Sequence, residues 1–212
     1  ADKERELTAF RQELSKVNGQ LEKFIGQISQ ELKLAGHIQR ILVPTEIPTI
    51  PGFEFSTKFV SSATSGGDYF DIFELEDKMR FGILMASSSG HGMASLFLSV
   101  LLKLTTQIEA KKGMDPDQVL KQMSQEIRSN LKENGLANVF YALVDRRRFE
   151  LAYSRSGGFL AFIYKYSEDK LVKLDATQSP ITKSSTGSFK TESIQLDPRD
   201  KVILASNGII WP

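Results

Sequence analysis

Two stretches decide the fold, SATSGGDYFD (residues 62–71) and ILMASSSGHG (residues 83–92). Gly66 and Gly67 precede Asp68, and glycine permits a tight turn that aims the carboxylate at one point. The aromatic and β-branched residues of 69–73 and the apolar run of 80–85 predict two strands. We expect the ends of these strands to meet, so that Asp68 and the small residues of 87–92 border one site.

Three motifs, GGDYFD (66–71), SSGHG (88–92) and SNG (206–208), follow one another along the chain. In this order they resemble the GGDxxD, DxSGHG and TDG motifs of the SpoIIE-type branch of the metal-dependent PPM, or type 2C, protein phosphatases. Two flanking patterns of that branch, AxxIQxxLxP and a PG step, are matched by Ala35, Ile38, Gln39, Leu42, Pro44 and by Ile50, Pro51, Gly52. The resemblance covers nearly everything after residue 34. It implies an α+β sandwich of two antiparallel sheets flanked by helices, and hydrolysis of phosphoserine or phosphothreonine.

In the resembled family two Mg²⁺ or Mn²⁺ ions activate a water, which needs oxygen ligands and anionic charge. Asp68 matches one aspartate ligand, whereas Ser87 and Asn207 stand where the family has two others. Serine and asparagine offer neutral oxygens, so the resemblance implies one weakly bound Mn²⁺ or Mg²⁺, or none. The backbone carbonyl of Ser88 is a further ligand position, and His91 matches a residue with a proton-transfer or supporting role. The supporting positions are Gly66, Gly67, Asp71, Gly90, Gly92 and Gly208.

Further departures from the family also indicate an altered metal site. Residues 155–158 read RSGG where the family has NAGH, and residues 198–200 read PRD where it has PGD. The sequence also ends soon after SNG, before a closing family strand that carries another metal-binding aspartate. The resemblance therefore implies a phosphatase-like domain over 35–212 that is truncated at its C-terminal end.

The N-terminal segment has a different pattern. Its apolar residues alternate spacings of three and four, which is typical of the a/d seam of a coiled coil; they are Leu7, Phe10, Leu14, Val17, Leu21, Phe24 and Ile28. Glu6 and Arg11 fall at g and e positions, where a parallel partner helix could pair them. The pattern predicts a dimerisation helix over 1–34, although packing of the same face on its own domain is an alternative. Gly19 and Gly26 weaken the helix.

Composition narrows the class of protein. The 212 residues carry a formal net charge of +1 and no cysteine, so there is no electrostatic case for nucleic acid and no disulfide framework. No apolar stretch is long enough to span a bilayer, and we expect a cytoplasmic domain, alone or as the cytosolic part of a larger sensor protein. We interpret Arg146–Arg148 as a hairpin turn after Asp145.

Periodicity gives a coarse map of the remaining chain. Helices are predicted at 96–111 and 116–132, the second starting with Asp115 as N-cap and Pro116 at its first position. A polar loop is predicted at 183–188. Strands are predicted at 53–59, 69–73, 81–85, 139–145, 150–155, 159–166 and 202–205.

Three functions are compatible with these patterns. The first is a pseudophosphatase, a dimeric module that binds a partner such as a phosphorylatable STAS-type antagonist or a switch kinase. The second is an active Mn²⁺- or Mg²⁺-dependent protein phosphatase with an altered metal site that uses Asp68, Asp71 and Asn207. The third is a structural output domain that transmits a signal from an upstream sensor through the coiled coil.

Overall fold

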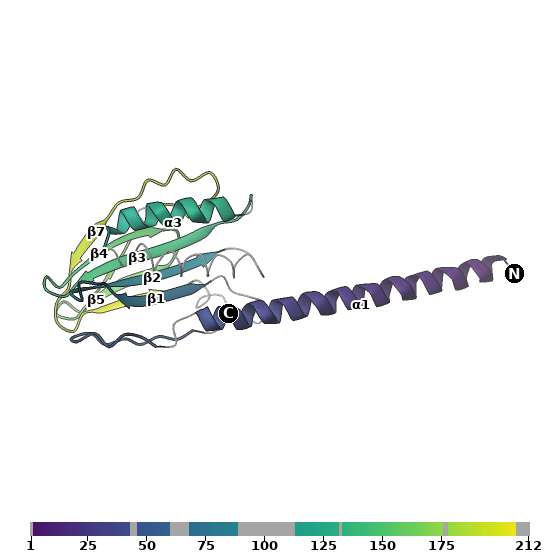
Figure 1. Ribbon diagram of the computed structural model, residues 1–212, viewed down its shortest axis with the longest axis horizontal. Helices are drawn as coiled ribbons and strands as arrows, with labels where there is room; N and C mark the ends of the chain where they lie inside the picture. Colours follow the sequence, from purple (N-terminus) through teal and green to yellow (C-terminus); the bar gives the residue numbers. More distant parts are fainter. Residues whose placement is uncertain are drawn as a thin grey trace.

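Two antiparallel sheets form the body of the protein (Figure 1). The computed structural model describes residues 2–42, 46–59, 68–88, 113–131, 133–175 and 178–206. The larger sheet has the order β1-β2-β3-β4-β7, with β1 Tyr69–Glu74, β2 Arg80–Ser88, β3 Ala137–Asp145, β4 Glu150–Ser156 and β7 Glu192–Gln195. The smaller sheet has the order β6-β5-β8, with β5 Leu160–Lys165, β6 Lys170–Lys173 and β8 Lys201–Ala205.

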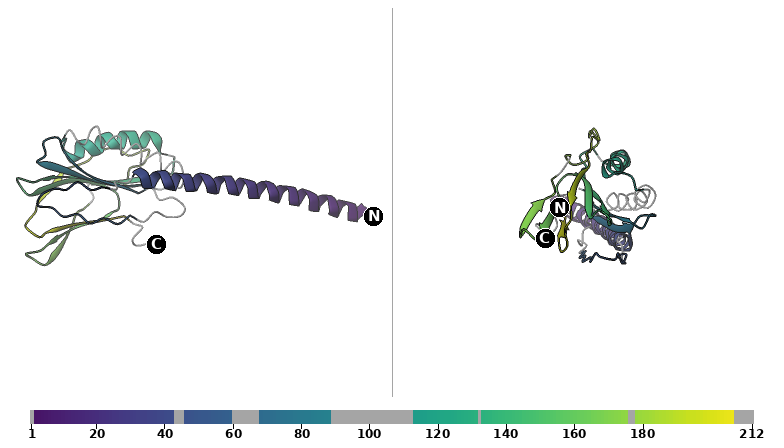
Figure 2. Two further views of the ribbon diagram at one scale, coloured as in Figure 1. Left: turned by 60° about the horizontal axis from the view of Figure 1, so that its bottom comes forward. Right: turned by 90° about the vertical axis from the view of Figure 1, so that its left-hand side faces the viewer.

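Strand alternation divides the core into two layers. One face of the larger sheet packs against helix α3 (Pro116–Asn130), where Leu120 and Ile127 contact residues such as Tyr141. The other face packs on the smaller sheet, where Phe81 and Phe140 lie among the inward residues of β5. The order helix, sheet, sheet confirms the predicted α+β sandwich (Figure 2).

Helix α1 (Asp2–Leu42) extends away from the two sheets (Figures 1 and 2). The seven residues of the predicted seam are all exposed, from 40% of the side chain at Ile28 to 63% at Phe10. The structure therefore contradicts the alternative in which this face packs on its own domain. The helix also continues past residue 34 to Leu42. None of the helices in the described ranges is both long and apolar enough to cross a bilayer.

Most predicted elements are confirmed, with boundaries displaced by one to three residues. The strand predicted at 53–59 is wrong, because these residues are irregular and pair with none of the strands that the structure describes. Their aromatic side chains pack instead: the rings of Phe53 and Phe55 lie edge-on to Phe81, with centroids 4.9 and 5.7 Å away. Strands β6 and β7 were not predicted, since both are short and largely exposed. The helix predicted at 96–111 lies outside the described residues.

The turns follow the local chemistry that the sequence suggests. Asp145 Oδ1 accepts hydrogen bonds from the backbone N–H groups of Arg147 and Arg148, at 2.8 and 3.1 Å, which confirms the hairpin turn. Asp115 occupies the N-cap position of α3, but its side chain makes no capping hydrogen bond. Residues 183–188 form a loop without helix or strand, as predicted.

An ion cluster links the end of β5 to the turn between β7 and β8. Lys165 Nζ lies 2.6 Å from both Asp197 Oδ2 and Asp200 Oδ2. Burial alone would raise the pKa of Asp200, but hydrogen bonds from Lys165 and from the N–H groups of Asp197 and Tyr166 outweigh it and lower that pKa. The PRD sequence therefore keeps its aspartate as a structural anion.

Candidate functional site

Four side chains from both sheets converge at one end of the sandwich. The register pairs Tyr69 with Ala86 and Ser87 with Asn138, so Asp68 precedes β1 beside the end of β2. Alternation places Asp68, Ser87 and Asn138 on the face that looks toward the smaller sheet. From that sheet Ser206, the residue after β8, makes a side-chain hydrogen bond with Asp68.

Asp68 is the acidic residue that the sequence placed here. Its carboxyl is half-buried, and burial raises its pKa from the ordinary value of 3.8, while the hydrogen bond with Ser206 partly opposes the shift. A divalent cation would favour the ionised form, whereas burial in the protein raises the pKa and so disfavours that form relative to a carboxyl in water.

Ser87, at the first substituted ligand position, is engaged by a neighbour. Asn138 Nδ2 donates to Ser87 Oγ at 3.1 Å, and Asn138 Oδ1 accepts from the backbone N–H of Gly158 at 3.1 Å. Because that N–H can only donate, it fixes the orientation of the Asn138 amide and turns its NH₂ group toward Ser87. The corner next to Ser87 therefore presents a hydrogen-bond donor.

Gly157 makes this contact possible. It adopts φ +78°, and a Cβ atom there would lie 1.8 Å from Asn138 Oδ1. The buried Arg155 side chain holds the same turn by donating to the carbonyls of Gly157, Phe159 and Leu174. The RSGG segment thus packs as a hydrogen-bonded support for Asn138.

The other predicted site residues are placed as follows. Asp71 Oδ2 accepts from Tyr69 Oη at 3.1 Å, on the opposite face of β1 from Asp68. Ser88 pairs with Ala137 at the end of β2, and its buried Oγ has no hydrogen-bond partner in the described part of the chain. The predicted positions outside the described residues are Gly66, Gly67, Gly90, His91, Gly92, Asn207 and Gly208.

The described side chains do not fit a pair of divalent cations. Within the described ranges, no three His, Cys, Asp or Glu residues are grouped closely enough to hold a metal ion. The oxygen of Ser87 already accepts a hydrogen bond, and the amide beside it offers N–H rather than a lone pair. Carboxylate ligands and lone pairs are what Mg²⁺ and Mn²⁺ require.

Sequence reasoning missed Asn138. It is 7% exposed in a strand whose other eight residues are all apolar except for the terminal Asp145 and the Tyr141 hydroxyl. A single amide inside the run ANVFYALV was the available signal, because buried polar groups are normally hydrogen-bonded to something specific.

Comparisons with known proteins agree with this architecture. The family model for stage II sporulation protein E (SpoIIE) matches residues 77–210. The phosphoserine phosphatase RsbU of Bacillus subtilis is 22% identical over 183 residues, 86% of this chain and 54% of RsbU. The phosphoserine phosphatase RsbP of the same organism is 24% identical over 187 residues, 86% of this chain and 46% of RsbP. This chain spans about half the length of each of these relatives.

Solved structures show the same fold. The SiaA-PP2C domain of Pseudomonas aeruginosa superposes with a TM-score of 0.67 at 22% identity, over 89% of this chain and 74% of that one. The structure of the PP2C phosphatase domain of SpoIIE from Bacillus subtilis, with a fragment of its regulatory domain, gives a TM-score of 0.58 at 22% identity, over 69% and 42%. These likenesses support the two-sheet phosphatase-type fold.

The raised pKa of Asp68 has a measurable consequence for stability. The folded state binds the Asp68 proton more tightly than the unfolded state, so stability is lost as the pH rises from the unfolded pKa through the folded pKa. We expect Asp68→Asn to raise the thermal midpoint near neutral pH and to change it little near pH 4. Differential scanning calorimetry across this range measures both values.

Asp77 provides the matched control for Asp68→Asn. Burial alone would raise the pKa of Asp77, but the hydrogen bonds from the Arg80 side chain and from the N–H groups of Met79 and Arg80, together with the Arg80 charge, outweigh it and lower that pKa. Asp77→Asn should therefore destabilise at neutral pH and lose that effect as the solution is acidified. An Asp68→Asn variant that behaves like Asp77→Asn would contradict the burial argument.

Proposed function

Because this chain belongs to the SpoIIE family and carries a PPM-type phosphatase domain, we propose that it is a catalytically impaired member, a pseudophosphatase that acts as a dimeric signalling module. The observation that carries the proposal is the hydrogen bond from Asn138 to Ser87. At Ser87, where the resembled family has a metal-ligating aspartate, the neutral NH₂ group of Asn138 donates a hydrogen bond instead. Residues 35–212 would form the phosphatase-like domain, and residues 1–34 the dimerisation helix.

The names of the relatives support a class of partner. RsbU and RsbP are both named phosphoserine phosphatases, so we propose a phosphorylatable regulatory protein, such as a STAS-type antagonist or its switch kinase, as the molecule that this domain binds. A domain that binds such a protein without hydrolysing it would compete with active enzymes for it. The exposed seam of α1 supports a second role, in which the helix passes a signal from an upstream segment to the domain.

Asp68 supports the alternative of an active enzyme with an altered metal site. It is present, half-buried and bound to Ser206 across the two sheets, which is a position from which one Mn²⁺ or Mg²⁺ could be held. A single cation can still act as a Lewis acid. The two proposals differ in one result, metal-dependent turnover by the unaltered chain.

Phosphate-ester hydrolysis separates the two proposals. We would measure turnover of p-nitrophenyl phosphate and of a phosphoserine protein at millimolar Mn²⁺, for the parent, Asp68→Ala and the double variant Ser87→Asp with Asn207→Asp. The pseudophosphatase predicts no Mn²⁺-dependent turnover in the parent, and recovery in the double variant is expected if the rest of the site is intact. Parent turnover that disappears in Asp68→Ala would establish the active enzyme instead. Mn²⁺ binding followed by electron paramagnetic resonance reports on the metal separately from turnover.

A further inference from the structure

The turns at the end of the sandwich remote from Asp68 contain unusual backbone. We call these turns, 75–80, 145–149, 166–170 and 196–200, the hairpin end. Each holds a residue other than glycine at positive φ, which side chains with a Cβ adopt at a cost unless they are Asn or Asp; these residues are Lys78 (φ 52°), Phe149 (φ 50°), Asp169 (φ 49°) and Arg199 (φ 74°). A bulky residue held in this conformation is a reason to look for function.

Phe149 is the least expected of the four. An aromatic residue gains nothing locally from positive φ, and its side chain is 51% exposed instead of packed in the core. The backbone around it is held firmly: the N–H of Leu196 donates to the Phe149 carbonyl at 2.6 Å, and Gln195 Nε2 donates to the carbonyls of Arg148 and Phe149 at 2.6 and 3.1 Å. The ring is therefore presented to solvent from a rigid support.

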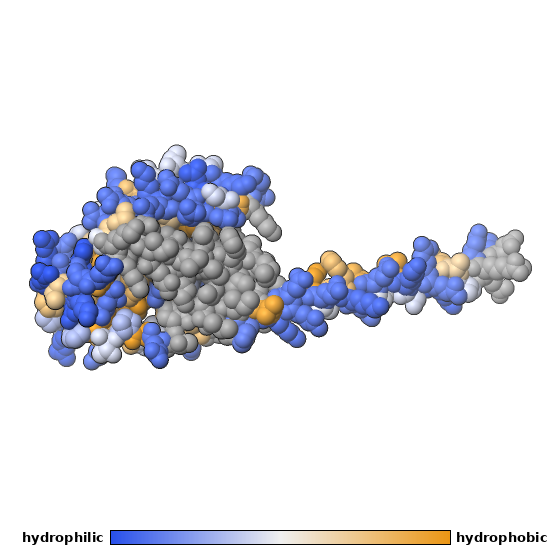
Figure 3. Space-filling view, in the orientation of Figure 1, coloured by the Kyte–Doolittle hydropathy of each residue, from blue (hydrophilic) through white to orange (hydrophobic). Residues whose placement is uncertain are grey.

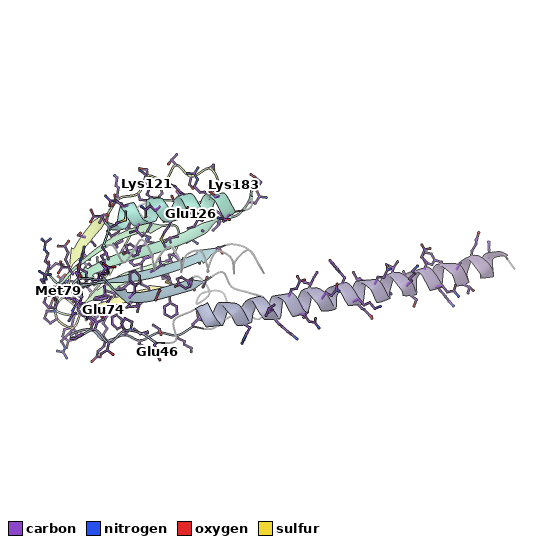
Figure 4. All side chains as sticks on the ribbon, viewed as in Figure 1. Glu46, Glu74, Met79, Lys121, Glu126 and Lys183 are labelled. Atoms are coloured by element: carbon purple, nitrogen blue, oxygen red, sulfur yellow. The ribbon has the colours of Figure 1, made fainter. Side chains whose placement is uncertain are left out.

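Other exposed side chains extend this surface. Met79 is 38% exposed and lies at the far tip from α1 (Figure 4), where its carbonyl accepts from the N–H of Arg146 at 3.0 Å. Tyr166 is 42% exposed, and the Arg199 guanidinium stacks 4.2 Å from its ring centroid. Figure 3 shows hydrophobic patches interrupting the hydrophilic surface at this end. Aromatic residues, Met and Arg are the types enriched in the cores of protein interfaces.

The acidic and basic side chains of the hairpin end differ in whether they make contacts within the fold. The aspartates are used within the fold: Asp77 binds Arg80, Asp145 caps its own turn, and Asp197 and Asp200 bind Lys165. In contrast, the exposed side chains of Arg147 and Arg148 form no ion pair among the described residues. Asp169 accepts a hydrogen bond from Tyr164 Oη. Glu76 and Glu168 are the remaining acids of these turns, and Glu150 follows Phe149 directly. Lys78 and Lys170 are also exposed and also form no ion pair among the described residues. The two arginines are thus the cations nearest to Phe149 in sequence that are left for a partner.

We propose that the hairpin end is a docking surface for an acidic protein segment with an apolar anchor. Carboxylates of the segment would pair with Arg147 and Arg148, and its apolar side chain would cover Phe149 and Met79. The six residues of β1 separate this surface from Asp68 by about 20 Å at roughly 3.3 Å per residue. A partner docked here would leave the Asp68 end of the sandwich open, so the inference does not depend on whether that site is active.

Phe149→Gly should stabilise the fold and weaken binding. These opposite effects distinguish an aromatic residue kept for binding from one kept for structure. Glycine tolerates φ 50° without strain, so the thermal midpoint should rise. Binding should weaken about tenfold or more, as when an interface hot spot is truncated. The probe is a fluorescein-labelled peptide of glutamate, leucine and glycine, followed by anisotropy against the full chain.

Charge variants and alternative probes complete the test. Arg147→Glu with Arg148→Glu should also weaken the peptide about tenfold or more, whereas Lys121→Glu with Lys190→Glu, two exposed cations elsewhere, should leave it unchanged. No binding by the parent, or binding that survives Phe149→Gly, overturns the proposal. Binding of a single-stranded oligonucleotide or of phosphatidylglycerol vesicles that depends on Phe149 and the two arginines, in preference to the peptide, would also overturn it.

Discussion

Gly157→Ala is expected to lower the free energy of unfolding by about 2–5 kcal/mol. Two costs combine. A residue with a Cβ pays about 1–2 kcal/mol to adopt left-handed backbone, and Gly157 has φ +78°. The new Cβ would also lie 1.8 Å from Asn138 Oδ1 and 2.7 Å from its Cγ, so the amide must move. A buried amide that loses its partners costs about 1–3 kcal/mol more.

Gly158→Ala is the matched control for Gly157→Ala. Gly158 is the next residue, but its φ is not in the left-handed region and nothing lies within 4 Å of a Cβ built there. Urea denaturation should therefore place Gly158→Ala within about 1 kcal/mol of the parent. Equal effects of the two alanines would show that the turn tolerates a Cβ at either position, and that the Asn138 contact is weaker than its geometry indicates.

The displacement caused by Gly157→Ala should reach Ser87, the candidate ligand position, through Asn138. If the amide moves, Ser87 loses its donor as well. In ¹⁵N-correlated spectra the Asn138 side-chain NH₂ signals should shift in Gly157→Ala and in Ser87→Ala, but not in Gly158→Ala. The turn, the amide and Ser87 would then behave as one hydrogen-bonded unit that joins the end of β2 to the β4–β5 turn.

The sequence predicted the parts of the site that short motifs encode. Asp68 and Ser87 could be placed together because each lies at the end of an apolar strand, and the β1–β2 register confirms that placement. Asn138 could not be assigned, because its partners Ser87 and Gly158 lie 51 and 20 residues away in the chain. Only the β2–β3–β4 register brings them together, and periodicity does not specify which strands pair.

The errors in the predicted fold also arise from contacts that local sequence does not specify. Aromatic alternation at 53–59 predicted a strand, but the rings of Phe53 and Phe55 are satisfied by Phe81 without any ladder. Conversely, β7 is mostly exposed and is defined by its pairing with β4, from Glu150 with Gln195 to Tyr153 with Glu192. Burial drives the hydrophobic pattern, whereas edge strands depend on backbone pairing that leaves little trace in side-chain type.

The exposed seam of α1 predicts the second large effect, complete loss of dimerisation in Leu14→Lys with Leu21→Lys. Both residues are about half exposed, at 50% and 53%, and both fall at a positions, which meet their equivalents across a parallel coiled coil. In the variant dimer, the two lysines at position 14 would face each other, as would the two at position 21. Each pair would bring like charges together and remove buried apolar surface. Sedimentation equilibrium should give a dimer for the parent and a monomer for the variant.

Lysines on the outer face of the same helix provide the control. Gln12 and Ser15 fall at f and b positions, away from the seam, so Gln12→Lys with Ser15→Lys adds the same charge and should leave the dimer intact.

Gly19 and Gly26 also lie at f positions, with nothing within 4 Å of an added Cβ. Their replacement by alanine should stabilise the helix by about 1 kcal/mol each without changing the oligomeric state. A monomeric parent would contradict the seam, as would a dimer that survives lysines at Leu14 and Leu21. Since α1 is unbroken from Asp2 to Leu42, a rotation or separation imposed at its start would reach its other end, about 60 Å away at 1.5 Å per residue.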